Sequence, residues 1–403
     1  MFPVREFHNG INQPAALAGA ILLVLALTVN PPAAFGGNQI AAWGAGEIIK
    51  TSDGNDYGQS MVPAGLTNAV MVAGGWRHSL ALRSDGTLKG WGDDSLGQTD
   101  FPPGSNYLSV ACGDLHSLAL RSNGTVVAAG DFYYGQTEVP VNLSNVVAIA
   151  CGFYHNLVLK SDGSLSAWGG QGSINYGQGS VPGGISNVVA IAAGGYHNLI
   201  LKSDGTLFAW GLNDYGETNI PAGLSNVVAI AAGAGHNLAL KADGTVVAWG
   251  SNIYGQTNVP VNLSNVVAIT AGGWHNLALE ANGTVAAWGA GGGSNANVDY
   301  GQNIVPPGLT NVIEMAAGDL NSLALVGNAP PSPKATAGQF SWETNGFSFS
   351  LPTQNGRVYQ LEWQDNLAGV WQPELLVAGT GTDVRFADHA TASPRRFYRV
   401  LRW

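Results

Sequence analysis

The sequence predicts an all-β protein: a seven-bladed propeller that is closed by an N-terminal strand and followed by a small C-terminal β-sandwich-like module. A unit of three short apolar runs recurs along the chain, a histidine marks its copies at a spacing near 40 residues, and each end of the array holds an incomplete copy. The 57 glycines and 10% charged residues among 403 are typical of a turn-rich β protein with a large core.

The recurring unit is clearest over residues 228–250, VAIAAGAGHNLALKADGTVVAWG. It predicts a strand, a glycine-rich turn, a second strand, a tight hairpin and a third strand. Asp243-Gly244 between apolar runs favours a type I′ turn, in which both central residues have positive φ. The same punctuation recurs at 85–86, 123–124, 162–163, 204–205 and 282–283, with 327–328 as a degenerate last copy.

The period is given by the first residue of the second run. Successive copies are separated by 38, 39, 42, 39, 39 and 46 residues. A unit of this length cannot bury its own faces and must stack on neighbours, which indicates propeller blades or a solenoid. The marking residues are His78, His116, His155, His197, His236 and His275, with Asn321 in the last copy.

The two ends of the array distinguish a closed ring from an open solenoid. The third run ends in Trp-Gly, and the first such pair, Trp43-Gly44, precedes every histidine run. The last second run, NSLAL at 321–325, has no Trp-Gly run after it. We therefore expect the N-terminal run QIAAWG to pair into the final blade and close a ring of seven.

Four segments are expected: a signal peptide at 1–36, the propeller at 37–328, a Pro-rich linker at 329–338 and the β-module at 339–403. The apolar run at 15–29 is shorter than the roughly 20 residues of a membrane span. It fits an export signal, so we expect a secreted, periplasmic or cell-envelope protein with no membrane span after cleavage. A retained N-terminal anchor is the alternative.

The net charge narrows the class of partner, and the two cysteines leave two structural interpretations open. Residues 37–330 carry 8 Lys and Arg against 19 Asp and Glu, which disfavours nucleic acid as a partner because phosphate backbones attract clustered cations. Cys112 and Cys151 occupy the same place in consecutive units. They either form a bridge at the outer limit of disulfide geometry or are small apolar residues that replace alanine.

The phrases GGWHNLALEANGTVAAWG and GAGHNLALKADGTVVAWGSNIYGQTNVP resemble repeats of the regulator of chromosome condensation family, whose fold is a seven-bladed propeller. The form with GQT, two residues and VP is most similar to the branch of secreted bacterial propeller-type β-lactamase inhibitors. The resemblance implies a protein-binding, inhibitor-like platform that works as a monomer. Guanine-nucleotide exchange, the activity of eukaryotic members, is the less favoured alternative, because it uses a wedge-like insertion that this sequence lacks.

The resemblance also implies which residues bind. In the inhibitor branch a partner lies across one face of the ring and is held by residues next to the histidine, which here include Arg77, Tyr154, Tyr196 and Trp274. Such residue types form interface hot spots. A second candidate ring lies in the loops after Trp-Gly and includes Asp94, Phe132, Tyr133 and Asp214. The alternative for each is an ordinary exposed loop residue.

The repeated histidines are interpreted as structural. One per blade is too dispersed for the three or four ligands of a zinc site, and a histidine after a glycine bend is expected to hydrogen-bond backbone at the strand start. No metal or cofactor is expected. The sequence holds no nucleophile elbow or phosphate loop, and no carboxylate pair is singled out. A binding protein is thus favoured over an enzyme, with a carbohydrate-binding or polysaccharide-active propeller as the alternative.

Overall fold

The structure, a computed structural model, describes residues 38–46, 57–291, 299–327, 338–343, 346–353, 357–364, 372–380, 383–388 and 397–402. The predicted signal peptide lies outside these residues, as does the predicted linker apart from Gly338. Within them, regular structure is almost entirely β, with one short 3-10 helix at Gly172–Ile174. No helix in the described ranges has the length and apolarity needed to cross a membrane.

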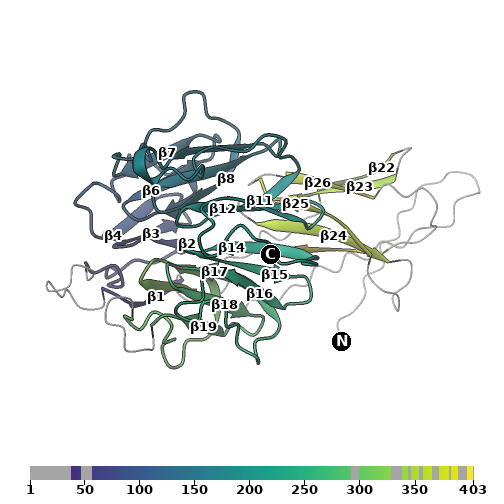
Figure 1. Cartoon of the computed structure of the whole chain (residues 1–403). Coiled ribbons are helices and arrows are strands. Elements are labelled where there is room, and N and C mark those ends of the chain that lie inside the picture. The colour runs from purple at the N-terminus through teal and green to yellow at the C-terminus, as the bar shows by residue number, and fades with distance from the viewer. Residues whose placement is uncertain are drawn as a thin grey trace, which may run out of the picture.

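Seven three-stranded antiparallel sheets follow one another along the chain, each with an inner, a middle and an outer strand (Figure 1). Blades 1 to 3 are β2(Ala69–Gly74)-β3(His78–Arg83)-β4(Leu88–Gly92), β5(Tyr107–Cys112)-β6(His116–Arg121)-β7(Val126–Gly130) and β8(Val146–Cys151)-β9(His155–Lys160)-β10(Leu165–Gly169). Blades 4 to 6 are β11(Val188–Ala193)-β12(His197–Lys202)-β13(Leu207–Gly211), β14(Val227–Ala232)-β15(His236–Lys241)-β16(Val246–Gly250) and β17(Val266–Ala271)-β18(His275–Glu280)-β19(Val285–Gly289).

The seventh blade closes the ring. It combines β20(Val312–Ala317) and β21(Asn321–Val326) with the N-terminal β1(Gln39–Gly44), which pairs from Gln39 opposite Val326 to Gly44 opposite Asn321. The inner strands contact one another in succession around the ring, and β20 contacts β2. The predicted seven-bladed propeller with a shared closing blade is confirmed.

The hairpins between middle and outer strands differ from the predicted type I′ turn. Only the glycine of each Asp-Gly pair has positive φ, as at Gly244 with φ 80°. The Asp243 side chain accepts hydrogen bonds from the backbone N–H and the hydroxyl of Thr245, at 3.0 and 2.6 Å. The Asx bond keeps the aspartate in an ordinary conformation, so the loop is a three-residue turn that ends in a left-handed glycine.

The middle strands form the core of each blade, because they are covered on both faces by neighbouring blades. Their first five residues are buried in all seven blades, as at His236, Leu238 and Leu240. Each fully buried leucine contributes about 2 kcal/mol. Since the buried faces lie between blades, this contribution exists only when neighbours are in place.

The histidines join neighbouring blades through side chains. His197 Nε2 lies 2.9 Å from Asn237 Oδ1 in the next blade, and Asn237 donates its amide to the Glu217 carbonyl at 2.8 Å. Because that amide is already used as a donor, His197 donates from Nε2. We call these contacts the junction network: His78–Ser117, His116–Asn156, His155–Asn198, His197–Asn237, His236–Asn276, His275–Ser322 and Asn321–Ser79.

The expectation that the histidines bond backbone at the strand start is thus not what the geometry gives: Nε2 binds a side chain one blade away. The glycine three residues earlier is explained by the same contact. A Cβ on Gly233 would overlap the His236 ring and the Gly272 carbonyl of the next blade. Glycine is required there because the imidazole and the neighbouring backbone fill the space.

The C-terminal strands form two further three-stranded sheets, as the sequence predicts. One orders β22(Gly338–Glu343), β23(Gly346–Pro352) and β26(Asp383–Asp388), and the other β25(Gln372–Ala378), β24(Val358–Gln364) and β27(Phe397–Arg402). Leu351 and Phe386 of the first sheet pack with Tyr359 and Leu361 of the second.

This module contacts the hairpin side of the ring (Figure 1). The Leu376 N–H donates to the carbonyl of Ser203, in a blade hairpin, at 2.9 Å, and Arg357 pairs with Glu314 at 3.4 Å. Val358, Ala378, Arg357 and residues mostly of the inner strands line a cavity of about 190 Å³ between module and ring. The module therefore covers this end of the central channel.

Cys112 and Cys151 are free, half-buried thiols on adjacent inner strands. The Cys151 thiol lies 3.5 Å from the Ala111 carbonyl, and burial raises the pKa of both thiols, that of Cys112 to about 12.

Candidate binding face

One face of the ring carries the segments that vary most between blades. Each inner strand runs to this face, turns, and returns as the middle strand; each outer strand then ends on the same side. We define the turn face as the turns at 74–78, 112–116, 151–155, 193–197, 232–236, 271–275 and 317–321, with the loops that follow the outer strands. The Asp-Gly hairpins and the C-terminal module lie at the opposite end.

One backbone hydrogen bond of the turn face recurs in every blade, although the side chains around it differ. The residue before each histidine position accepts a hydrogen bond from the residue after Trp-Gly, as in Asp93 N–H to Arg77 carbonyl at 2.8 Å and Ala290 N–H to Trp274 carbonyl at 2.8 Å. The backbone thus fixes where each side chain starts, and its identity is free to vary.

Aromatic side chains of blades 2 to 4 form one connected cluster. The Tyr154 ring lies 5.1 Å from Tyr134 and 6.0 Å from Tyr196, and Tyr196 lies 5.5 Å from Tyr176. We call these residues, with Tyr133 and Phe153, the aromatic cluster. The structure therefore brings together three of the predicted binding residues: Tyr133, Tyr154 and Tyr196.

The other two predicted residues beside the histidines lie in separate places. The Arg77 guanidinium lies 3.6 Å from the centre of the Trp76 ring and 4.7 Å from that of Tyr57, so it is held by cation–π contacts. Trp274 packs only on Tyr254 among the described rings, with centroids 5.6 Å apart.

The predicted loop residues divide into two kinds. Phe132 and Tyr133 are 74% and 77% exposed, which is high for aromatic side chains. Asp94 accepts a hydrogen bond from the Thr99 N–H at 2.8 Å and so closes its own loop. Asp214 is exposed and lies outside the aromatic cluster. The loop aspartates are therefore weaker candidates than the aromatics.

A ring of residues that the sequence analysis did not single out lines the mouth of the central channel. They stand two positions before each histidine position: Trp76, Asp114, Phe153, Gly195, Ala234, Gly273 and Asp319. Backbone hydrogen bonds of 3.1–3.4 Å link six of the seven blade junctions here, for example Phe153 N–H to the Gly195 carbonyl. With inner-strand ends, these residues enclose a cavity of about 60 Å³.

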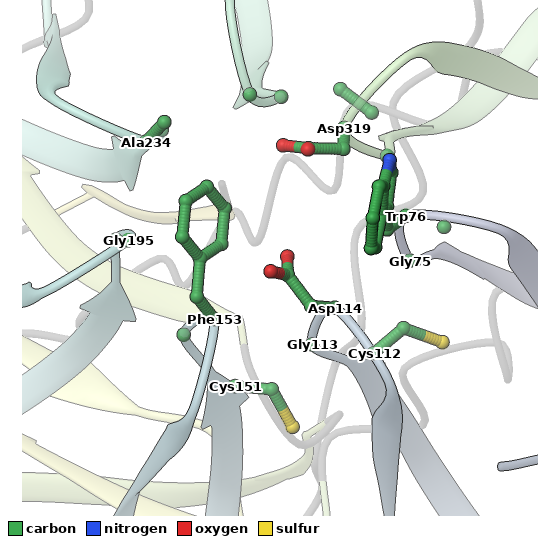
Figure 2. Close-up of a pocket in the computed structure, with 18 of the residues that line it drawn as sticks. Gly75, Trp76, Cys112, Gly113, Asp114, Cys151, Phe153, Gly195, Ala234 and Asp319 are labelled. Atoms are coloured by element: carbon green, nitrogen blue, oxygen red, sulfur yellow. The ribbon is translucent and has the colours of Figure 1, made fainter. Parts of the chain in front are cut away.

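Figure 2 shows the Asp114 and Asp319 carboxylates directed into this cavity, with the Trp76 and Phe153 rings beside them. Burial, and then the charge of Asp319, raises the pKa of Asp114 well above its usual range. Burial raises the pKa of Asp319 to about 7. Tyr154 hydrogen-bonds Asp114, which opposes the shift without cancelling it.

The sequence did contain a signal for this ring. The position two before the histidine varies from Trp to Asp, Phe and Gly, as does the neighbouring position that the analysis used. What no single repeat shows is that this residue, rather than the next one, points to the axis. No group of three or more His, Cys, Asp or Glu among the described residues is arranged to hold a metal ion.

Five stretches match the model of the Regulator of chromosome condensation (RCC1) repeat: residues 70–98, 108–136, 146–178, 188–217 and 227–256. They correspond to blades 1 to 5 with their linkers. No curated protein sequence matches the chain.

Solved structures agree on the fold. Prp20p of Saccharomyces cerevisiae, in a study of its binding to Gsp1p and histones, matches with a TM-score of 0.60 at 21% identity, over 73% of this chain and 92% of that one. Yeast RCC1 (Prp20) bound to Kap60 matches at 0.59 and 21%, over 80% and 96%. The CRINKLY WD40 ectodomain of the Arabidopsis thaliana receptor kinase ACR4 matches at 0.52 and 17%, over 65% and 94%.

Proposed function

We propose that this RCC1-repeat β-propeller is a rigid platform that binds another protein through its turn face, without covalent chemistry. The observation that carries the proposal is the aromatic cluster, whose six rings contact one another across three blades at the surface. Connected aromatic side chains on a preordered backbone are typical of interface hot spots, because little side-chain entropy remains to be lost on binding.

Two further observations support the choice of face. The C-terminal module contacts the hairpin side of the ring and leaves the turn face open. Prp20, which has the same fold, was studied with the protein partners Gsp1p, histones and Kap60. The wedge-like insertion expected of exchange factors has no counterpart in this sequence, so guanine-nucleotide exchange is not part of the proposal.

We place the site of action outside the cytoplasm, in the periplasm, the cell envelope or the medium of a bacterium. The basis is the expected signal peptide at 1–36 together with the likeness of the GQT–VP repeats to secreted inhibitors. A propeller of this kind can work outside a cell, since the ACR4 match is an ectodomain. An inhibitor-like role would follow if the bound protein is an enzyme whose activity falls.

The test is a pull-down from periplasm and culture medium of the native organism, with protein starting at residue 37. Wild type is compared with Tyr154→Ala/Tyr196→Ala and with Asp162→Asn, a control in an exposed hairpin on the opposite face. We expect a protein that wild type and control retain and the double variant loses, with binding weaker by about 1–3 kcal/mol per tyrosine when titrated. Equal retention by all three would exclude the aromatic cluster.

A glycan array with the same three proteins tests the alternative partner. Tyrosine rings also stack on sugars, so glycan binding that disappears in the double variant would replace the protein partner by a carbohydrate. Loss of folding is checked separately by the thermal midpoint of each variant.

A further inference from the structure

The cavity at the mouth of the central channel is shaped unequally by the seven blades. The large side chains come from blades 7, 1, 2 and 3, whereas blades 4 to 6 contribute Gly195, Ala234 and Gly273. These small residues make room for their neighbours: a Cβ on Gly273 would overlap the Asp319 carboxylate, and one on Gly195 would come within 3.1 Å of the Phe153 ring. The two small residues thus allow a carboxylate and a ring to reach the axis.

Among the described residues, neither carboxylate, that of Asp114 or that of Asp319, has a cation within ion-pair distance. Asp114 is 7% exposed, and its hydrogen-bonding neighbour is the Tyr154 hydroxyl. The charge of Arg77, whose guanidinium is stacked on two rings, lowers the pKa of Asp114 less than burial and the Asp319 charge raise it. A buried carboxylate without a cation is costly, so the ionised form of Asp114 is incompletely compensated, and the half-buried Asp319 adds a second negative charge beside it.

The walls of the cavity favour an organic cation. Trp76 and Phe153 flank the carboxylates in Figure 2, and aromatic rings attract ammonium groups. A hard metal ion would need six or more oxygen ligands for calcium or a near-octahedral set for magnesium, and the described residues offer two carboxylates here. A cavity of about 60 Å³ is large enough for an ammonium group and its first methylenes.

We propose that this cavity binds a protonated primary amine, with Asp114 and Asp319 as counter-ions and Trp76 and Phe153 as walls. The amine is either a free alkylamine or the end of a lysine side chain on a peptide or protein. The cavity shares Phe153 with the aromatic cluster, but it can bind a small amine whether or not a protein covers the turn face.

Binding must then depend on pH. An alkylamine keeps its charge below about pH 10. Asp319, with a pKa of about 7, is partly protonated at neutral pH, and burial together with the Asp319 charge raises the pKa of Asp114 well above its usual range. A bound cation favours the ionised carboxylates, so binding releases protons and affinity rises from pH 5 to pH 8.

The other titratable groups near the cavity do not change charge in this range. Burial raises the pKa of Tyr154 and Tyr196, which stay neutral. Burial lowers the pKa of His78 and His116, whose rings lie behind Gly75 and Gly113, to about 3 and 4. The two carboxylates therefore set the pH dependence.

The experiment is calorimetric titration of the protein from residue 37 with n-butylammonium chloride, with n-butanol as the neutral analogue of similar size. We expect binding of the amine only, weakened about tenfold or more in Asp319→Asn and unchanged in Asp85→Asn, a control in an exposed hairpin on the opposite face. Titrations in two buffers of different ionisation enthalpy should show proton release by wild type that falls in Asp319→Asn.

A second arm separates the two sources of the amine. Acetyl-Gly-Lys-Gly-amide is compared with acetyl-Gly-Gln-Gly-amide. If the lysine peptide binds at least as tightly as butylammonium, the site is assigned to a lysine side chain on a peptide or protein. If butylammonium alone binds, the site is assigned to a free amine. Equal binding of amine and alcohol, an unchanged affinity in Asp319→Asn, or no heat from either amine at millimolar concentration would overturn the proposal. The pull-down has no bearing on this result.

Discussion

The histidine position and the residue before it are adjacent in every blade, yet they behave oppositely. The first is histidine in six blades, nearly inaccessible, and bonded to the next blade; the second changes from Arg to Tyr, Gly and Trp. The junction network therefore holds the ring together, and the side chains that differ between blades lie on the turn face. Variation is tolerated at the turn face because its backbone is fixed by bonds that no side chain supplies.

The largest expected effect is a loss of stability at low pH, which acts on the histidines of the junction network and not on the turn face. Burial lowers the pKa of all six histidines, to about 3 for His78, His155 and His275 and about 4 for the others. An unfolded histidine titrates near 6.5, so the unfolded state binds more protons below that pH and stability falls as pH falls. Each histidine should therefore lower the free energy of unfolding by about 2 kcal/mol between pH 7 and pH 5.

The measurement is the urea unfolding free energy at pH 7 and 5. Asp114 and Asp319 act in the opposite direction, because their raised pKa values favour the folded state when they are protonated. The stability lost through six histidines exceeds the stability gained through two carboxyls, so the wild type should be close to unfolding at pH 5. His197→Asn, which copies the Asn321 solution of blade 7, should show a smaller pH dependence. An unfolding free energy that is equal at both pH values would contradict neutral buried histidines.

Gly233→Ala should have the next largest effect. The added methyl meets the His236 ring and the Gly272 carbonyl, and the carbonyl belongs to backbone that cannot move without shifting blade 6. We expect a loss of about 3 kcal/mol in unfolding free energy. Gly183→Ala is the matched control: this exposed linker glycine has open space around it, and its variant should stay within about 0.5 kcal/mol of wild type. Similar losses in both variants would remove the steric explanation.

The fold could be predicted because the information repeats. The strand order and the number of blades follow from the Trp-Gly runs and the histidine runs. The shared closing blade follows from the one run at each end of the array that has no partner in its own copy. The bonding partner of His197 could not be predicted, because Asn237 lies 40 residues along the chain. The predicted type I′ hairpin was wrong, because the Asp243 carboxylate accepts a hydrogen bond from the Thr245 N–H and the residue keeps a negative φ.

The candidate site could be predicted only in part, for a related reason. The repeat shows which positions vary, and three of the variable aromatics do meet in one cluster. It does not show which of two adjacent variable positions faces the axis, since a turn has no simple periodicity. Asp114 and Asp319 belong to blades 2 and 7, and their approach follows only from ring closure.

Replacing a tryptophan of the outer strand by phenylalanine should give the smallest effect and the sharpest comparison. Trp249 donates its indole N–H to the Glu217 carbonyl at 3.0 Å, whereas the buried indole N–H of Trp210, at the same place one blade earlier, has no partner in the described structure. Both side chains are 7% exposed, so the loss of packing is similar. Trp249→Phe should therefore cost about 1 kcal/mol more than Trp210→Phe, which removes an unsatisfied donor. Urea midpoints at pH 7 measure the difference, and Trp288→Phe, whose indole bonds the Gln256 carbonyl at 2.9 Å, should follow Trp249→Phe. If Trp210→Phe were the more destabilising, the junctions around blade 4 would be bonded differently from those of the other blades.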